Sequence, residues 1–178
     1  MEHPEDIVLD PNTLLAECNI EKDHNIADFG CGPGIFSIPM AQIVVDGTVY
    51  CFDVLSSALE AVNSRAQIIG LRNIVTKRSN LEKVNGSGLE DSAVNHVIMR
   101  KILLQNQDRP ALFAESYRVL NGGGNLLVVG WTEDAVQGFG MEERVSAEEV
   151  QKYAMEAGFA DEKKLDAGRY HYAFVFVK

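Results

Sequence analysis

Three glycines and two acids, Asp28 and Asp53, form the part of the chain whose residue types best suit ligand binding. The stretch 25–36 reads N-I-A-D-F-G-C-G-P-G-I-F, with glycines at alternate positions behind an apolar run. Glycine lets the backbone adopt positive φ and approach a ligand without a Cβ in the way. Asp53 follows Gly34 by nineteen residues, where an acid can accept hydrogen bonds from both hydroxyls of a ribose. The pattern indicates a nucleoside-containing ligand; the alternative is a tight turn with Asp53 capping a helix.

The spacing of the glycines distinguishes between classes of such ligands. A dinucleotide site needs G-x-G-x-x-G, which seats a pyrophosphate on a helix N-terminus. Counting from Gly30 the sixth position is Ile35, and counting from Gly32 it is Ser37, so this fingerprint is absent. Asp28 would repel a pyrophosphate and would suit a cationic group such as an α-amine or a sulfonium. A nicotinamide-dependent reductase is therefore disfavoured.

The elements that must position these residues alternate between strands and helices. Apolar, β-branched and aromatic runs predict seven strands, over 25–30, 48–54, 73–78, 93–99, 125–131, 159–167 and 169–178. Helical spacing predicts helices over 35–45, 57–69, 109–120 and 146–157, with room for one short helix within 9–18. The alternation indicates parallel strands joined by crossover helices.

Local signals set several boundaries of these elements. Ser57 with Glu60, and Ser146 with Glu149, have the spacing of capping boxes at two helix starts. The run N-G-G-G at 121–124 is expected to turn the chain into the strand that follows.

The predicted fold is α/β, a three-layer doubly wound, mostly parallel seven-stranded sheet with an antiparallel C-terminal strand. The reversal is expected because only Gly168 and Arg169 separate the last two predicted strands, too few for a parallel crossover. In such a sheet ligands bind beyond the carboxyl ends of the strands. The glycine loop and Asp53 should meet there.

Composition indicates a soluble cytoplasmic protein with one domain, which we assign to 1–178 with 1–24 as a short N-terminal extension. The net charge of −10 argues against nucleic acid or an anionic membrane as a partner. Cys18, Cys31 and Cys51 are odd in number and lack metal-type spacing, so neither a disulfide framework nor a metal is expected. We find no secretion signal and no apolar run of the ~20 residues that span a membrane.

The motif D-F-G-C-G-P-G at 28–34 resembles the first motif of class I S-adenosylmethionine-dependent methyltransferases, usually written D/E-x-G-x-G-x-G. The resemblance extends over 25–178. It includes Asp53, the segment R-V-L-N-G-G-G-N-L-L-V-V and the closing A-G-F…Y-H-Y-A-F-V-F. It implies a Rossmann-like methyltransferase fold, S-adenosyl-L-methionine as the cofactor and methyl transfer to a small-molecule acceptor.

The resemblance also implies a set of residues that contact the cofactor: Asp28, Gly30, Cys31, Gly32 and Gly34 at the methionine part, Asp53 at the ribose hydroxyls, Val54 at the adenine, and Asn80, Leu81 and Met99. Asn80 stands where the family usually has an Asp that accepts a bond from the adenine amino group. An amide oxygen can accept that bond too.

The segment after the fourth strand, M-R-K-I-L-L-Q-N-Q-D at 99–108, should face the substrate. Arg100 and Lys101 could hold an anionic group of the substrate, or they could be a solvated basic pair. Trp131 could line an apolar pocket or pack under the loop 134–144. His171 is a further candidate for substrate contact, at the same end of the sheet.

The other histidines have structural interpretations: His96 is expected in the core, and His3 and His24 on the surface. No catalytic residue is assigned, because methyl transfer from a sulfonium needs mainly in-line positioning and exclusion of water. A general base is required only for weak nucleophiles such as hydroxyls.

No large lid precedes the first predicted strand. The site is therefore open, covered by the loop 138–144, or covered by the second subunit of a homodimer. An alternative function is a catalytically silent regulatory module that binds S-adenosylmethionine or S-adenosylhomocysteine.

Overall fold

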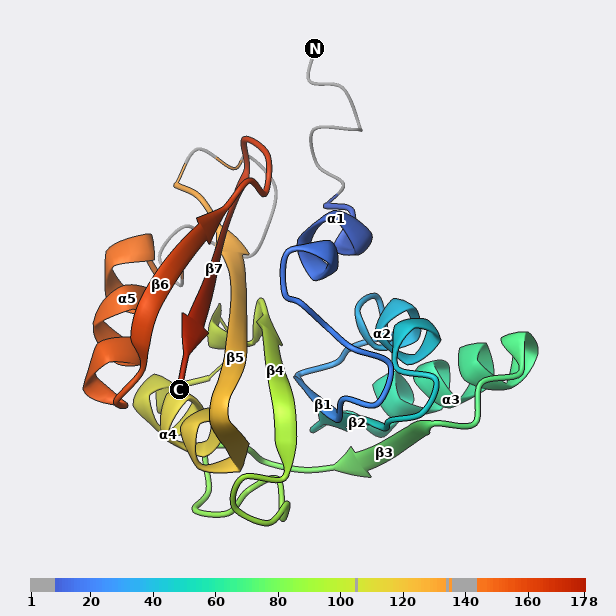
Figure 1. The fold of residues 1–178 in the computed structure, drawn as a ribbon. Helices are drawn as coiled ribbons and strands as arrows, with labels where there is room; N and C mark the ends of the chain where they lie inside the picture. Colours follow the sequence, from blue (N-terminus) through green and yellow to red (C-terminus); the bar gives the residue numbers. More distant parts are fainter. Residues whose placement is uncertain (1–8, 105, 134, 136–143) are drawn as a thin grey trace.

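A seven-stranded sheet forms the centre of the protein (Figure 1). The computed structural model describes residues 9–104, 106–133, 135 and 144–178. The strands are β1 (Ile26–Phe29), β2 (Val49–Asp53), β3 (Ile74–Arg78), β4 (Val94–Arg100), β5 (Leu120–Trp131), β6 (Ala160–Leu165) and β7 (His171–Val177). Their order is β3-β2-β1-β4-β5-β7-β6. The ladder is parallel except at β7, which runs antiparallel to both β5 and β6. The predicted fold class is confirmed.

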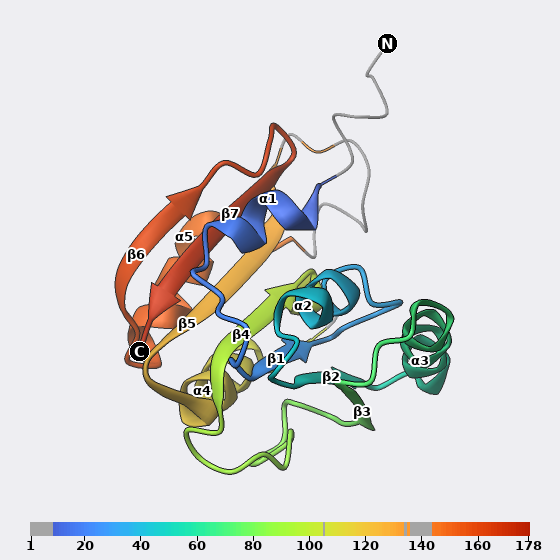
Figure 2. The same cartoon turned by 45° about the vertical axis from the view of Figure 1, so that its right-hand side comes forward.

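Helices cover both faces of this sheet (Figure 2). They are α1 (Pro11–Ala16), α2 (Ser37–Ile43), α3 (Ser56–Ile69), the 3-10 helix η2 (Ile102–Leu104), α4 (Arg109–Val119) and α5 (Ala147–Glu156). On one face α4 and α5 pack through residues such as Phe113 and Val150. On the other face α1, α2 and α3 pack through Leu14, Met40 and Val62. Two buried clusters therefore fix the sheet between two helical layers.

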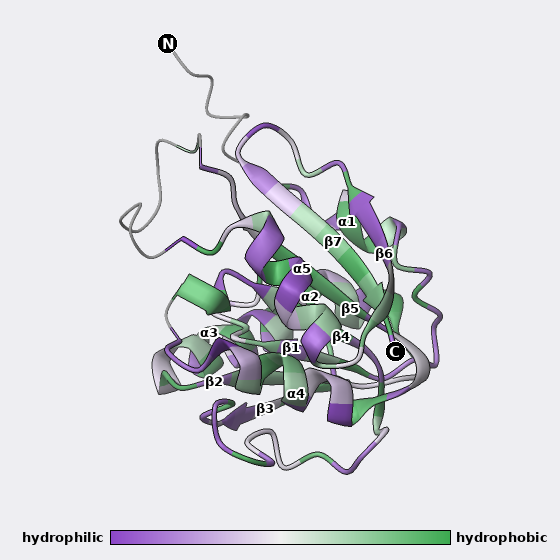
Figure 3. Cartoon of the chain, turned by 90° about the vertical axis from the view of Figure 1, so that its left-hand side faces the viewer, coloured by the Kyte–Doolittle hydropathy of each residue, from purple (hydrophilic) through white to green (hydrophobic). Residues whose placement is uncertain are grey.

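The two edge strands carry charged residues, which protects the sheet from pairing with other chains. β6 reads A-D-E-K-K-L, so four charged residues lie between its apolar ends (Figure 3). β3 ends in Lys77 and Arg78, which are exposed. Charged edge strands of this kind disfavour edge-to-edge association. The apolar strands β1, β4, β5 and β7 lie inside the sheet and carry its core.

The two expected capping boxes have different outcomes. At α5 both bonds form: the Ser146 hydroxyl accepts the N–H of Glu149, and the Glu149 carboxylate accepts the N–H of Ser146. At α3 the prediction is wrong, because the N-cap is Leu55 and no side chain caps the helix. Asp53 instead accepts the N–H of Leu55 at 2.9 Å. The carboxylate that ends β2 holds the start of α3.

The expected turn at 121–124 is also wrong, because β5 begins directly after α4, at Leu120. The glycines pair with the end of the chain: the N–H of Gly123 donates to the Lys178 carbonyl, and the N–H of Lys178 donates to the Gly124 carbonyl. The β4–β5 register shifts between Val94 and His96, beside the same run. Glycine accommodates such an irregularity within a strand.

The first crossover helix is shorter than predicted. Residues 32–36 form turns, and α2 begins at Ser37 rather than at 35. Pro39 thereby falls in the first turn of the helix, where its missing N–H costs no intrahelical bond. The loop between β1 and α2 is consequently longer than the glycine motif itself.

Candidate functional site

A cavity of about 640 Å³ lies beyond the carboxyl ends of β1 to β4. This volume is within the range of about 300–1,000 Å³ typical of small-molecule sites. The cavity is lined by the loop after β1, the end of β2 with the start of α3, the segment 79–82, and Arg100, Lys101, Ile102 and Asn106. Strand order changes direction between β1 and β4, which is the place where doubly wound sheets bind ligands.

The glycine loop enters the cavity in a conformation that glycine makes accessible. Gly30, Gly32 and Gly34 have φ values of +73°, +52° and +83°. A Cβ on Gly34 would come within 3.0 Å of Val62, so this glycine lets the loop lie close to α3. A Cβ on Gly32 would have no neighbour within 4 Å, because that side of the loop is open. The loop therefore leaves its backbone accessible to a ligand.

Asp28 is a buried acid on the wall of this cavity. Its side chain is almost inaccessible, and Oδ2 accepts a hydrogen bond of 2.6 Å from the Ser37 hydroxyl. Burial raises the pKa of Asp28 to about 6, an effect that the Ser37 bond and the nearby Arg100 partly oppose. A cationic ligand group would favour the ionised form of this carboxyl.

Asp53 ties the glycine loop to the next strand. Its Oδ2 accepts the N–H of Gly32 at 3.0 Å, and its Oδ1 accepts the N–H of Leu55 at 2.9 Å. An ionised carboxylate offers about four acceptor sites, so each oxygen can still accept one ligand hydroxyl. Val54, half exposed, lines the cavity beside it. The arrangement can bind a vicinal diol next to an apolar surface.

Asn80 lines the cavity from the segment after β3. Its Oδ1 accepts the N–H of Glu82 at 2.9 Å, which closes a local turn. The oxygen that was expected to face the adenine is thus already in use, although it keeps one acceptor site and the amide keeps its donors. Leu81, next in the chain, is buried and supplies apolar surface to the same wall.

Four residues predicted on the substrate side form a continuous group. Arg100 and Lys101 line the cavity. Lys101 Nζ lies 3.9 Å from the centroid of the Trp131 ring, and Trp131 stacks on His171 with ring centroids 4.2 Å apart. Burial, together with Lys101 and Arg100, lowers the pKa of His171 to about 4. This ring is therefore neutral at physiological pH, and Trp131 connects it to Lys101, which does line the cavity.

Some predicted residues do not line the cavity: Gly34, Met99, Trp131 and His171. Met99 is in the core beneath α4, where its sulfur accepts a bond from the Ser116 hydroxyl at 3.8 Å. Trp131 packs with Ala135 and Tyr170, and Ala135 is the one described residue of 134–143. Most of the loop 134–144, together with Gln105 and His3, lies outside the described residues.

Several lining residues were missed by the sequence reasoning: Pro33, Ile35, Phe36, Leu55, Ser57, Ala58, Ala61, Ser79, Glu82, Ile102 and Asn106. Most of them directly follow a strand end, in the turns where each crossover begins. These residues could have been predicted from their position after the predicted strands 25–30, 48–54, 73–78 and 93–99, since ligands bind at the carboxyl ends of parallel strands.

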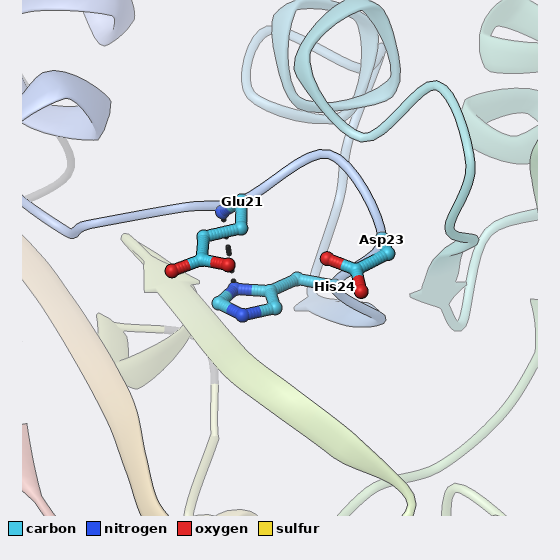
Figure 4. A group of neighbouring side chains, drawn as sticks. All are labelled: Glu21, Asp23 and His24. Carbon is cyan, nitrogen blue, oxygen red and sulfur yellow. Dashed lines mark hydrogen bonds between the residues drawn. The ribbon is translucent and has the colours of Figure 1, made fainter.

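A second polar group, Glu21, Asp23 and His24, lies near the amino ends of β1 and β4 (Figure 4). Their ligand atoms lie within 4.8 Å of one another, but exposed acids of this kind are common without a bound ion. His24 Nδ1 accepts the N–H of Glu21 and lies 2.8 Å from His96 Nε2. His96 is buried, as predicted, and His24, which was predicted at the surface, is half-buried because its ring packs on His96.

Comparison with known proteins gives both a family and a fold. Residues 26–124 match the family model described as a methyltransferase domain. A protein of Haemophilus influenzae, described as uncharacterized, is 36% identical over 63 residues. That alignment spans 35% of this chain and only 23% of the relative.

Solved structures share the fold over nearly the whole chain. An S-adenosylmethionine-dependent methyltransferase from Aquifex aeolicus has a TM-score of 0.87 at 22% identity, over 98% of this chain and 93% of the other. Phosphoethanolamine N-methyltransferase 2 from Haemonchus contortus has a TM-score of 0.77 at 14% identity, over 94% of this chain and 52% of the other. The latter was solved with phosphomonomethylethanolamine and S-adenosylhomocysteine.

Proposed function

Because the chain belongs to the methyltransferase-domain family, in the class I group that uses S-adenosylmethionine, we propose that it methylates a small-molecule acceptor in the cavity beyond β1 to β4. The observation that carries this proposal is the placement of two acids beside the glycine loop that opens into that cavity. Asp28 precedes the loop in β1, and Asp53, at the end of β2, accepts the N–H of Gly32 within it. When bound, the cofactor supplies a methyl group that moves from the sulfonium to a lone pair of the acceptor, while the carbon–sulfur electron pair stays on sulfur.

In this proposal two acids contact different parts of the cofactor. Asp28 stabilises the cationic methionine part, since a buried carboxylate attracts a positive charge strongly in a medium of low polarity. The open side of Gly32 allows close approach of the ligand to the loop backbone.

At the other end, Asp53 accepts hydrogen bonds from the ribose hydroxyls through the acceptor sites that Gly32 and Leu55 leave free. Val54 and Leu81 supply apolar surface for the adenine. The amide of Asn80 offers its two N–H donors to the ring nitrogens, rather than relying on the oxygen that Glu82 occupies.

The chain itself contributes position and exclusion of water to the methyl transfer. Such a transfer is accelerated mainly by aligning the acceptor with the carbon–sulfur bond. The Haemonchus contortus protein, similar in fold, was solved with a small phosphate-bearing molecule, which supports an acceptor of small size here. The homodimer that would cover the opening stays a prediction.

Calorimetric titration with S-adenosylhomocysteine tests the cofactor assignment. We expect Asp53→Asn to weaken binding by about ten- to a hundredfold, because the negative charge is lost and one of the two acceptor oxygens is replaced by an amide donor. Asp46→Ala is the matched control, since Asp46 is an exposed acid paired with Lys22 and the cavity is lined by other residues.

Two results would contradict the assignment: no binding of S-adenosylhomocysteine to the wild type, or stronger binding of NADH. Binding without turnover on a panel of small acceptors would instead favour a regulatory module that uses the same site.

A further inference from the structure

Arg100 and Lys101 differ from the other basic residues of the described chain. Six lysines and arginines there are half-buried: Arg100, Lys101, Arg109, Arg118, Arg144 and Lys178. The last four use their side chains in hydrogen bonds or ion pairs. Within the same described ranges, the side chains of Arg100 and Lys101 form neither. Partial removal of a charge from water is costly without a partner. Both cations are therefore suited to a ligand that supplies an anionic partner.

Among the residues that the structure describes, Lys101 contacts an aromatic ring and forms no ion pair with an acid. Its backbone has a φ of +61°, and its N–H donates to the Val129 carbonyl at 3.0 Å. The ammonium lies against Trp131, which stacks on His171. The face of an indole attracts a cation but accepts no conventional hydrogen bond. The three N–H donors of Lys101 are therefore available to a ligand.

Arg100 has a polar atom that no described group satisfies. Its Nε is buried without a hydrogen-bond partner among the described residues, as is Nε2 of His171. Its guanidinium carbon lies 5.9 Å from the centroid of the Phe36 ring. The negative charge of Asp28 opposes the lowering of the Arg100 pKa that burial causes. Neither a hydrogen bond nor an ion pair joins Asp28 and Arg100 in the described structure. Burial and the neighbouring Arg100 also lower the pKa of Lys101 to about 8, as expected for two like charges close together.

The distribution of charge around the cavity specifies the kind of acceptor. In the proposed function Asp28 faces the cationic part of the cofactor and Asp53 faces the ribose. The third acid of the lining, Glu82, accepts the N–H groups of Gln107 and Asp108 through Oε1. In the described structure none of these acids forms an ion pair with the basic pair. The sulfonium adds a further positive charge. A pocket with several positive charges raises the local concentration of anions and lowers that of cations.

We infer that Arg100 and Lys101 form a subsite for an anionic group of the acceptor, a carboxylate or a phosphate. This inference rests on the proposed function and adds the chemical class of its substrate. Arginine suits both anions because its planar donors match two oxygens at once.

Titration of inorganic phosphate and of acetate into the protein saturated with S-adenosylhomocysteine tests the subsite. We expect Arg100→Gln and Lys101→Gln each to weaken anion binding about tenfold or more, because a hydrogen bond to a charged group is lost. Lys164→Gln is the matched control: Lys164 is exposed on β6, outside the cavity lining, and should leave anion binding unchanged. Cooperative thermal unfolding of each variant shows that it is folded.

A second pair of titrations distinguishes an acceptor anion from the carboxylate of the cofactor itself. S-adenosylhomocysteine has that carboxylate, and 5′-methylthioadenosine lacks it. Unchanged affinity of Arg100→Gln and Lys101→Gln for both compounds, with anion binding lost, supports the acceptor subsite. A tenfold loss for S-adenosylhomocysteine alone would assign the pair to the cofactor and overturn the inference.

Two further outcomes separate this inference from the proposed function. If the wild type binds S-adenosylhomocysteine but neither phosphate nor acetate, the subsite is overturned while the cofactor assignment stands. If the wild type binds no S-adenosylhomocysteine, the proposed function fails and the inference fails with it.

Discussion

Asp28 shows how one buried acid can favour one class of ligand. Its carboxyl group is buried, is bonded to Ser37 and lies on the cavity wall. A carboxyl in such surroundings is reluctant to ionise, and its pKa is raised to about 6. A cationic ligand group reverses that cost, whereas a phosphate would add to it. The preference for a cationic group therefore arises from burial and charge at a single residue.

Cofactor affinity should depend on pH through Asp28. With a pKa of about 6 in the ligand-free protein, the carboxyl is ionised above pH 6 and becomes protonated below it. Affinity for S-adenosylhomocysteine should then be constant above about pH 7 and fall up to tenfold per unit well below pH 6. Calorimetry between pH 5 and 8 measures this profile.

Two variants test the origin of the profile. Ser37→Ala removes a hydrogen bond that lowers the pKa of Asp28, so the midpoint should move to higher pH. Asp28→Asn should bind weakly and lose the dependence. A profile that is the same in all three proteins would exclude Asp28 as its source.

His96, near the amino end of the central strand β4, should make the stability of the protein depend on pH. Burial and the adjacent His24 lower the pKa of His96 from 6.5 to about 4 in the folded protein. The unfolded chain therefore binds more protons between these values, so this contribution to stability is complete above pH 6.5 and is lost as pH falls toward 4. The difference corresponds to at most about 3 kcal/mol.

Urea unfolding at pH 4.5, 5.5 and 7 of the wild type and of His96→Gln isolates this contribution. His171 adds a slope of the same sign, and Asp28, whose pKa is raised, adds one of the opposite sign. Both are present in the two proteins and cancel in the comparison. Equal pH dependence of the wild type and the variant would show that His96 does not contribute.

At the scale of elements, the starts of α3 and α5 are held by different side-chain hydrogen bonds. α3 begins at Ser56, and Asp53 accepts the N–H of Leu55 just before it. The same carboxylate also lines the cavity. α5 begins with a complete capping box between Ser146 and Glu149. One helix start serves the site, and the other stabilises the fold.

Removing the two serines should therefore have different effects. Ser146→Ala should lower the free energy of unfolding by about 1 kcal/mol, because the N–H of Glu149 loses its partner. Ser57→Ala should change it by no more than about 0.5 kcal/mol, since Ser57 forms no capping bond in α3. Chemical denaturation of both variants provides the comparison; equal losses would mean that Ser57 does cap its helix.

At the scale of the whole molecule, the two helical layers hold the sheet so that four strand ends converge on one cavity. The clusters on the two faces include Phe113 and Val150 on one side and Met40 and Val62 on the other. Since residues from β1 to β4 and their loops line the cavity, a ligand there contacts several elements at once. No helix among the described residues is long and apolar enough to cross a membrane.

Ligand binding should consequently stabilise the whole fold. S-adenosylhomocysteine at a hundred times its Kd should add about 2.7 kcal/mol to the free energy of unfolding. For a chain of 178 residues this corresponds to a rise in Tm of about 5–10 °C. Thermal unfolding with and without ligand measures the shift, which Asp53→Asn should reduce at the same ligand concentration. A Tm that does not change with ligand would contradict binding to the native state.

The sequence alone was sufficient for the order of the elements, because its signals are local. Alternating apolar runs and helical spacing predicted all seven strands, and the two residues between the last strands predicted the reversal of β7. The glycine spacing and the two acids predicted where the cavity lies. Each of these signals depends on residues that are close together in the chain, so it can be read without knowledge of the tertiary packing.

Only the tertiary structure decided how groups from different elements are used. Asp53 and Asn80 turned out to bond backbone N–H groups, and His24 lies against His96, 72 positions along the chain. The run 121–124 became strand because the chain end pairs with it. Within the described ranges Arg100 and Lys101 form no ion pair with an acid, which was likewise invisible in the sequence, since the partners available to a charge are set by the packing of distant segments.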